Sequence, residues 1–237
     1  MLSKNKFIML AIMASLLLSA CGETTDESAE QTSEEATPAE QVSKNAEEPT
    51  EKSEVSEPKT DESGNTILDE VGQTATSEVG TVELKKIINV NETVDIAPLK
   101  VTVQGIKVLE MTDVHPDFAE SLTWQADADI SQVKDGFTYV QVTYQAENTA
   151  DQNIQWYDLM NITTDQGEQI DGQMKDILID DADMDSEFIG EVKKDYVDGF
   201  ILKNPDINSI KLIYGYTMNG DTYEDITGEQ TVEYSFE

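Results

Sequence analysis

The chain has 237 residues, with 49 acidic residues against 15 basic ones and a formal charge of -34. All the basic residues are lysines, so both an excess of positive charge and the guanidinium fork suited to phosphate are missing, which argues against DNA or RNA as a partner. A single cysteine excludes an internal disulfide and every metal or redox motif built from several cysteines.

The first twenty residues have the three zones of an export signal. Lys4 and Lys6 give a positive start, residues 7–18 form an almost unbroken apolar run, and Ser19 and Ala20 are small. As a helix this run would be roughly 18 Å long, which is less than the bilayer core of about 30 Å. We therefore expect residues 1–20 to be a cleaved signal peptide and not a permanent membrane span.

Residues 18–22, Leu-Ser-Ala-Cys-Gly, resemble the lipobox of bacterial lipoproteins, in which a cysteine thiol is acylated and the chain is cut just before it. The thiol is the nucleophile that takes up the lipid, such as palmitate-containing diacylglyceryl. Two acyl chains suffice for stable anchoring, since each buried CH₂ adds about 0.8 kcal/mol. We expect Cys21 to hold the protein at the outer face of the cell membrane. The alternatives are a secretory signal with an incidental cysteine, or a short core helix.

Residues 21–80 have the composition of a disordered acidic linker. Positions 22–80 contain no aromatic residue and carry 17 acidic residues against three lysines. Such a segment cannot bury enough apolar surface to fold, and a flexible chain of this length spans roughly 40 Å. We expect a solvated tether, and its length favours a Gram-positive cell wall. The alternative is a docking segment near residues 65–71 that orders on a partner.

From residue 81 to the end, short alternating runs rich in Val, Ile, Thr and Tyr predict an all-β domain. Residues 137–147 are the clearest strand and should be central, because apolar and polar side chains alternate along it. Asn91 and Glu92 should form a turn, residues 219–220 a hairpin turn, and residues 115–122 a short helix. The expected strands are 82–89, 92–96, 100–110, 137–147, 159–164, 188–193, 196–202, 210–218, 222–226 and 231–236. So many short strands predict a β-sandwich.

Residues 137–149, Phe-Thr-Tyr-Val-Gln-Val-Thr-Tyr-Gln-Ala-Glu-Asn-Thr, followed by Leu159 and the turn at 165–167, resemble the immunoglobulin-like, telokin-like domain of uncharacterised Gram-positive lipoproteins. The resemblance covers roughly residues 90–236. It implies an immunoglobulin-like sandwich and no catalytic residues, since its motifs serve packing and turns. The chain departs from the pattern in an insert at 112–135 and in an acidic stretch after Lys175, where Ile189 and Gly190 replace a Pro-Gly turn.

The densest group of carboxylates lies at residues 180–187. The alternate spacing of Asp181, Asp183 and Asp185 is typical of a loop that wraps Ca²⁺. An EF-hand would place Gly and Glu where this chain has Ser186 and Val192, so the match is partial. The loop is either a calcium site or a solvated acidic segment.

Other candidates for chemistry are few. His115 is the chain's one histidine, so it cannot build a histidine-based metal site, and no G-x-S-x-G elbow accompanies it. A pair of carboxylates for glycoside hydrolysis stays open, because it depends on spatial separation. Trp124, Trp156 and Tyr157 lie in or beside expected loops, where they would stack on a sugar or a partner, or else belong to the core.

These observations predict a lipid-anchored surface protein without enzymatic activity or cofactor. Its partner would be an unknown protein or a component of the cell envelope, besides the membrane that holds Cys21. Two alternatives stay open, a calcium-binding accessory lipoprotein and a hydrolase that acts on cell-wall polymers.

Overall fold

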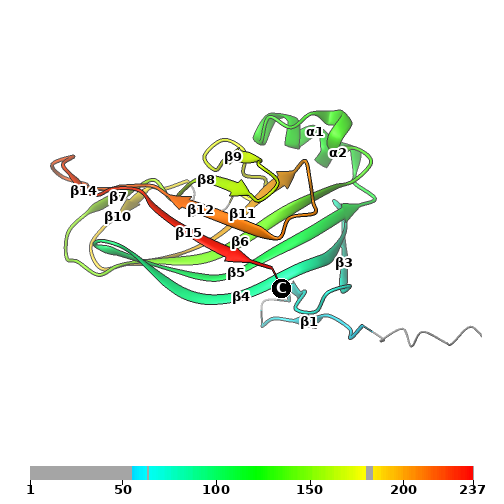
Figure 1. Cartoon of the computed structure of the whole chain (residues 1–237), viewed down its shortest axis with the longest axis horizontal. Helices are drawn as coiled ribbons and strands as arrows, with labels where there is room; N and C mark the ends of the chain where they lie inside the picture. Colours follow the sequence, from blue (N-terminus) through cyan, green and yellow to red (C-terminus); the bar gives the residue numbers. More distant parts are fainter. Residues whose placement is uncertain (1–54, 63, 180–183, 237) are drawn as a thin grey trace, which may run out of the picture. The chain divides into compact units, whose positions relative to one another are not determined.

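The computed structural model describes residues 55–62, 64–179 and 184–236. Most of them form a β-sandwich in which one five-stranded antiparallel sheet packs face to face against two four-stranded antiparallel sheets, together called the second sheet (Figure 1). Cys21 lies outside the described residues, and so do Asp181 and Asp183. The described residues belong to one unit that spans positions 51–237. The fold is the predicted all-β sandwich.

The first sheet has five strands in the order β11-β6-β5-β4-β3. These strands are β11 (Lys193–Leu202), β6 (Phe137–Asn148), β5 (Leu99–Thr112), β4 (Gly80–Ile96) and β3 (Thr74–Ser77). Every neighbouring pair is antiparallel.

The second sheet is split across its middle into two four-stranded parts. One part has the order β15-β12-β8-β9, and the other has the order β10-β7-β13-β14. The strands are β7 (Ile154–Trp156), β8 (Leu159–Thr164), β9 (Gln169–Asp171), β10 (Glu187–Phe188), β12 (Ser209–Tyr214), β13 (Thr217–Asn219), β14 (Asp225–Thr227) and β15 (Gln230–Ser235).

A close backbone approach marks the split. Two short links, 157–158 and 215–216, carry the chain from β7 to β8 and from β12 to β13, and the Gly215 amide donates to the Asp158 carbonyl at 2.7 Å. A Cβ at Gly215 would lie 1.8 Å from the Tyr157 carbonyl oxygen, so only glycine fits where the two strands bend.

The strand order is that of an immunoglobulin-like sandwich. Strands β5, β6 and β11 occupy the A, B and E places of one sheet, and β8, β12 and β15 occupy the C, F and G places of the other. An isolated bridge between Asp176 and Phe200 lies where strand D would pair with strand E. The predicted immunoglobulin-like topology is therefore confirmed, with β4 and β3 added beside strand A.

An aromatic cluster fills the centre of the sandwich. Tyr144 on β6 stacks on Tyr196 of β11 at 4.8 Å between ring centroids, and meets the edges of Tyr214 and Trp156. Antibody domains place an inter-sheet disulfide between strands B and F beside a tryptophan on strand C. Here Tyr144 and Tyr214 occupy strands B and F, and Trp156 precedes the bend in strand C, so aromatic packing provides the link between the sheets.

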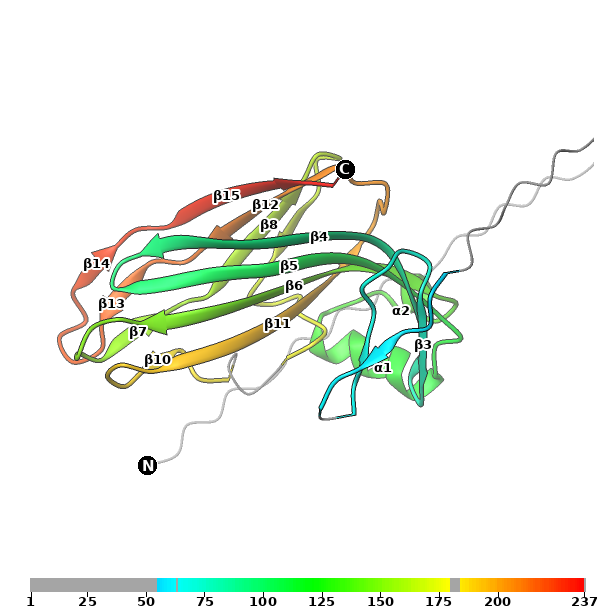
Figure 2. The ribbon, with the colours of Figure 1, turned by 90° about the horizontal axis from the view of Figure 1, so that it is seen from below.

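A second hydrophobic core covers the outer face of the first sheet at one end. The insert at 112–135 forms helices α1 (Pro116–Gln125) and α2 (Ile130–Val133), which bury Ala119, Leu122 and Val133. Figure 2 shows both helices at the end that also carries β3. Members of this core include Leu68, Leu84, Leu109, Met111, Phe137 and Tyr139. The ends of β5 and β6 are thus buried on both faces.

Several expected elements differ from the structure. Residues 82–89 and 92–96 are one strand, because Asn91 adopts φ 54° within a bulge of β4 instead of a turn. The bend divides residues 210–218 into β12 and β13. The expected strand 188–193 is not a single strand, because Phe188 is the last residue of β10 and Lys193 is the first residue of β11. The predicted helix extends to Gln125. Strands β7 and β9, each of three residues, were not expected.

The folded unit begins before residue 81, the start that the sequence predicts. Strands β1 (Lys59–Thr60) and β2 (Thr66–Ile67) pair with each other, and β3 pairs with β4. Leu68 is buried in the second core, and the buried Gln73 side chain accepts from the amides of Asp69 and Glu70. The described residues between 55 and 80 are therefore part of the domain, where a solvated tether was expected.

Within the described part of the chain, no helix has the length and apolar character needed to cross a membrane.

Candidate functional site

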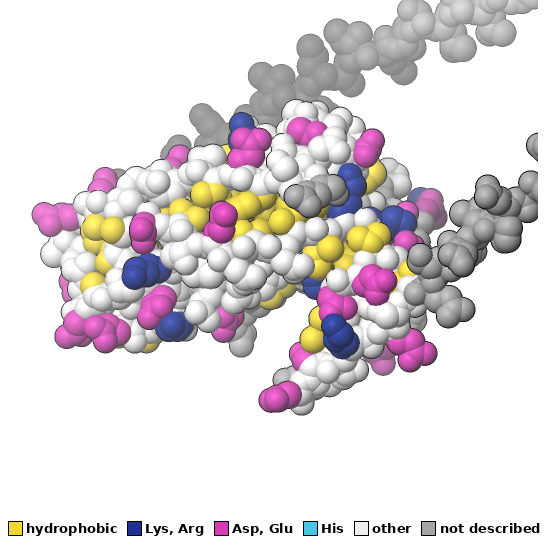
Figure 3. All heavy atoms as spheres, turned by 60° about the horizontal axis from the view of Figure 1, so that its bottom comes forward, with side chains coloured by type: hydrophobic (Ala, Val, Ile, Leu, Met, Phe, Trp, Pro, Cys, Tyr) yellow, Lys and Arg dark blue, Asp and Glu magenta, His cyan; other side chains and the backbone are white. Residues whose placement is uncertain are grey.

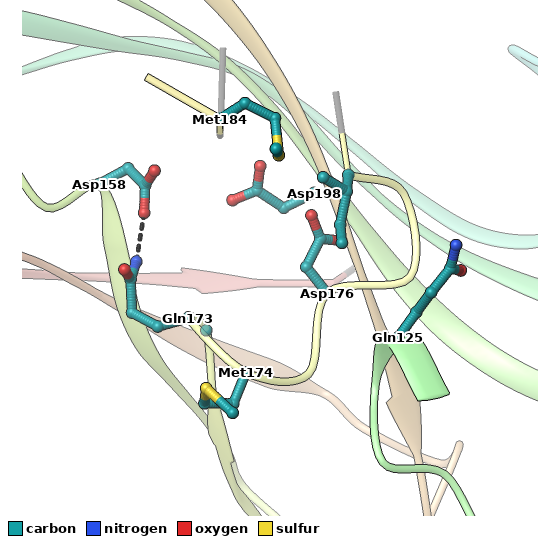
Figure 4. Close-up of a pocket in the computed structure, with 9 residues that line it drawn as sticks. Gln125, Asp158, Gln173, Met174, Asp176, Met184 and Asp198 are labelled. Carbon is teal, nitrogen blue, oxygen red and sulfur yellow. Dashed lines mark hydrogen bonds between the residues drawn. The ribbon is translucent and has the colours of Figure 1, made fainter. Parts of the chain in front are cut away.

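An acidic pocket of about 180 Å³ lies beside β11, at the edge of the first sheet. Asp158 comes from the link between β7 and β8, Asp176 follows β9, and Asp198 is on β11. Figure 4 shows the three carboxylates around one space, with Met184 and Met174 beside it. Three separate segments thus bring acidic groups to the same pocket.

Each carboxylate of the pocket is held by a donor from the protein. Asp198, only 4% exposed, accepts from the Tyr144 hydroxyl at 2.9 Å. Asp176 accepts from the backbone amides of Gly199 at 2.7 Å and Leu178 at 2.9 Å, and Asp158 accepts from the Gln173 side chain. These bonds fix the orientation of the carboxylates, so the pocket is built before any ligand arrives.

The rim of the pocket is apolar and exposed. Met174, Ile179 and Met184 line it, and their exposed fractions are 64%, 49% and 79%. The remaining lining residues are Gln125, Gly172 and Gln173. Exposed apolar side chains around convergent polar groups are the usual composition of a ligand site.

The Asp198 carboxylate of the pocket affects the pKa of two tyrosines in the sandwich core. Burial, reinforced by the charge of Asp198, holds the pKa of Tyr144 well above its ordinary value. Burial and Asp198 act in the same way on the pKa of Tyr214. Both phenols therefore stay protonated at neutral pH, and the Tyr144 hydroxyl keeps the proton that it donates to Asp198.

One of the three expected calcium ligands, Asp185, lies within the described residues. Its carboxylate accepts from the Glu187 amide at 3.0 Å and pairs with Lys194 at 3.0 Å. The backbone bond and the lysine lower the pKa of Asp185. Among the described residues, no three His, Cys, Asp or Glu side chains lie close enough together to hold a metal ion, and this includes the three aspartates of the pocket. The ionised Asp185 carboxylate is thus already in an ion pair with Lys194.

The other candidate residues take structural or isolated positions. His115 caps α1, its Nδ1 accepting from the Asp117 amide at 3.3 Å, and it does not line the pocket. Trp156 is 1% exposed and its Nε1 donates to the Gly215 carbonyl at 3.0 Å, so a stacking role on a surface ligand is excluded. Trp124 is 84% exposed on α1, and Tyr157 packs against Tyr216.

The sequence did not single out Asp158, Asp176 or Asp198. One signal was present, because Asp198 lies on the inward-facing side of a strand, between the aromatic residues Tyr196 and Phe200 on the same face. A buried acid in such a strand requires a partner. The grouping with Asp158 and Asp176 could not be read from spacing, since it depends on the crossover between β9 and β11.

Comparisons with protein-family models, with curated proteins and with solved structures gave no match. The resemblance to telokin-like lipoprotein domains therefore stays a prediction.

Proposed function

We propose that this chain is a lipid-anchored extracytoplasmic binding module without enzymatic activity, and that the acidic pocket is its ligand site for a cationic group. The leader and the lipobox at residues 18–22 support the location, with Cys21 as the point of attachment. The observation that carries the binding role is the convergence of Asp158, Asp176 and Asp198 inside an apolar rim.

A lysine-like group fits this chemistry. An ammonium or guanidinium head would meet the carboxylates, while its methylene stem would lie against Met174, Ile179 and Met184. An anionic ligand would be repelled by the three carboxylates, since the described residues that line the pocket include no lysine. The ligand class is therefore a primary amine or guanidinium carried on an apolar stem.

The described lining of the pocket is poorly suited to acyl transfer. Among the lining residues that the structure describes there is no Ser, Thr, Cys, Lys or His, the side chains that most often serve as nucleophile and base in that reaction.

The test is a titration of the isotope-labelled protein with n-butylamine, followed by the amide resonances of Leu178 and Gly199. Both amides donate to Asp176, so they report directly on the pocket. We expect saturable shifts with a dissociation constant of about a millimolar, and none with neutral n-butanol.

Two variants sharpen this test. Asp158→Asn should weaken binding of butylammonium, whereas Asp135→Asn, which changes an exposed carboxylate outside the pocket, should leave it unchanged. Equal shifts from the amine and the alcohol, or equal binding by both variants, would refute the pocket as a cation site.

A further inference from the structure

Three loops meet at the end of the sandwich opposite the helices. They are residues 149–153 between β6 and β7, 189–192 between β10 and β11, and 219–224 around the turn between β13 and β14. Figures 1 and 2 show this end at the left, where the labels of β10, β7 and β14 lie together. These are the BC, DE and FG loops of an immunoglobulin-like sandwich, referred to below as the tip.

Hydrogen bonds tie the loops to one another. Asn148 Nδ2 donates to the carbonyls of Gln152 and Gly190, both at 2.8 Å. The Gly220 amide donates to the Asn153 carbonyl at 2.7 Å, and Asn153 Nδ2 donates to Asp221 at 3.2 Å. Asn148, the last residue of β6, thus bridges the middle loop to loop 189–192, and Asn153 bonds the middle loop to loop 219–224. A surface ordered in this way loses little conformational entropy when a partner binds.

Two large apolar side chains stand exposed on the tip. Ile189 and Tyr223 are each 68% exposed. Their loops flank the middle loop, because Phe188 and Asn219 both pair with Ile154 from opposite sides. Two strand spacings put the two loop bases roughly 10 Å apart. Such side chains are typical anchors of a protein interface.

The negative charge of the tip favours a positively charged partner. The three loops contain four acids, Asp151, Glu191, Asp221 and Glu224, and no lysine, and all four acids are exposed. Figure 3 shows acidic side chains at this left-hand end of the molecule, with lysine side chains farther along the same face. Anionic polymers and lipid headgroups would be repelled, whereas a basic segment would be attracted.

The chain enters the domain at the other end. Val55 contacts Gly72, whose amide donates to the carbonyl of Leu84 near the start of β4. Strand β4 then runs to Ile96 at the tip, and its residues from Leu84 onward span roughly 40 Å at about 3.3 Å each. A tether attached at Val55 therefore leaves the tip directed away from its attachment point.

We infer that the tip, formed by loops 149–153, 189–192 and 219–224, docks a basic protein segment that carries apolar side chains for Ile189 and Tyr223. This inference rests on the proposed binding role but uses a surface separate from the acidic pocket. The carboxylates steer the segment, and the two apolar residues provide its main contacts.

The experiment is selection of short random peptides from a display library against the full lipidated chain, held in discs of neutral phosphatidylcholine. We expect the selected peptides to carry net positive charge together with aromatic or aliphatic residues. Replacing the anchors in Ile189→Ser/Tyr223→Asn should weaken their binding at least about tenfold. Asparagine suits position 223 because Tyr223 has φ 59°.

Matched variants separate the causes. Asp151→Asn/Glu224→Gln should weaken binding and flatten its salt dependence, whereas Trp124→Ser/Ile130→Ser, which removes exposed apolar side chains at the helical end, should leave it within about twofold. All of these positions are exposed, and melting curves check that each variant stays folded.

Peptides that bind the anchor variant as well as the parent, peptides that are neutral or acidic, or no enrichment at all would overturn the inference. Titration of the same variants with n-butylamine distinguishes this failure from failure of the proposed pocket. A pocket that binds the amine while the tip selects nothing refutes the tip alone, and the reverse result refutes the pocket alone.

Discussion

The Tyr144 hydroxyl donates a 2.9 Å hydrogen bond to Asp198 Oδ2, between neighbouring strands β6 and β11. Tyr144 is fully buried in the aromatic cluster, and Asp198 lines the acidic pocket. The residue that links the two sheets therefore also orients a carboxylate of the candidate ligand site, so the packing of the core and the geometry of the pocket depend on each other.

Removing this donor should be costly. Tyr144→Phe keeps the ring but takes the hydroxyl away from the buried Asp198 carboxylate, and we expect a loss of about 1–3 kcal/mol in the free energy of unfolding. Urea denaturation measures it. Tyr223→Phe is the control, because Tyr223 is exposed and should change stability by less than about 0.5 kcal/mol. Equal stabilities for the two variants would show that the bond contributes nothing.

The buried tyrosines predict instability in alkali. Burial raises the pKa of Tyr139 to about 12, and it raises the pKa of Tyr144 and Tyr214 well above the ordinary value near 10. Above pH 10 the unfolded chain releases these protons while the folded chain keeps them, so the free energy of unfolding falls as pH rises. Tyr139 alone accounts for roughly 2–3 kcal/mol by pH 12.

Urea denaturation at pH 8, 10 and 11, with tyrosinate absorbance as a second signal, tests this behaviour. Tyr139→Phe should reduce the loss of stability between pH 10 and 11. Stability that stays constant to pH 11, or ionisation of these tyrosines without unfolding, would contradict the buried positions.

The two tryptophans should respond in opposite ways to the same substitution. Trp156→Ala removes a fully buried side chain and its bond to Gly215, and should destabilise the domain by about 3–5 kcal/mol. Trp124→Ala changes an exposed side chain and should cost less than about 0.5 kcal/mol. Thermal and urea melts compare them. A small loss for Trp156→Ala would mean that the aromatic cluster does not hold the sheets together.

Calcium should leave stability unchanged. Asp185 is already paired with Lys194, and a calcium ion would have to displace that lysine. A site filled a hundredfold above its dissociation constant would add about 2.7 kcal/mol. We therefore expect the same melting temperature in millimolar calcium as in millimolar magnesium. A rise specific to calcium, abolished by Asp181→Asn or Asp183→Asn, would establish the metal site instead.

The sequence predicts a strand of the sandwich correctly where apolar and polar side chains alternate regularly along it. Residues 137–147 alternate throughout and form β6, an inner strand of the first sheet that lies between the edge strand β11 and the central strand β5. Alternation fails where the chain bends, so the split at Gly215 and the bulge at Asn91 were not foreseen. Strands β1 to β3 are short and polar, and depend on Leu68 and Gln73 being buried by the rest of the domain.

The candidate site was beyond sequence reasoning for a related reason. Asp158, Asp176 and Asp198 lie about twenty residues apart, and no spacing rule unites residues from a strand link, a bridge and a strand. Cys21 is the opposite case, because its role depends on its immediate neighbours alone. Local chemistry can be predicted from sequence, whereas a pocket formed by tertiary pairing needs the fold.

The most direct test of the central claim is metabolic labelling with palmitate, followed by the intact mass of the protein recovered from the membrane fraction. We expect label in the parent chain, a mature amino terminus at Cys21, and an uncleaved and unlabelled precursor for Cys21→Ser. Label that persists in Cys21→Ser, or a mature chain that is released without lipid, would contradict the anchored module proposed here.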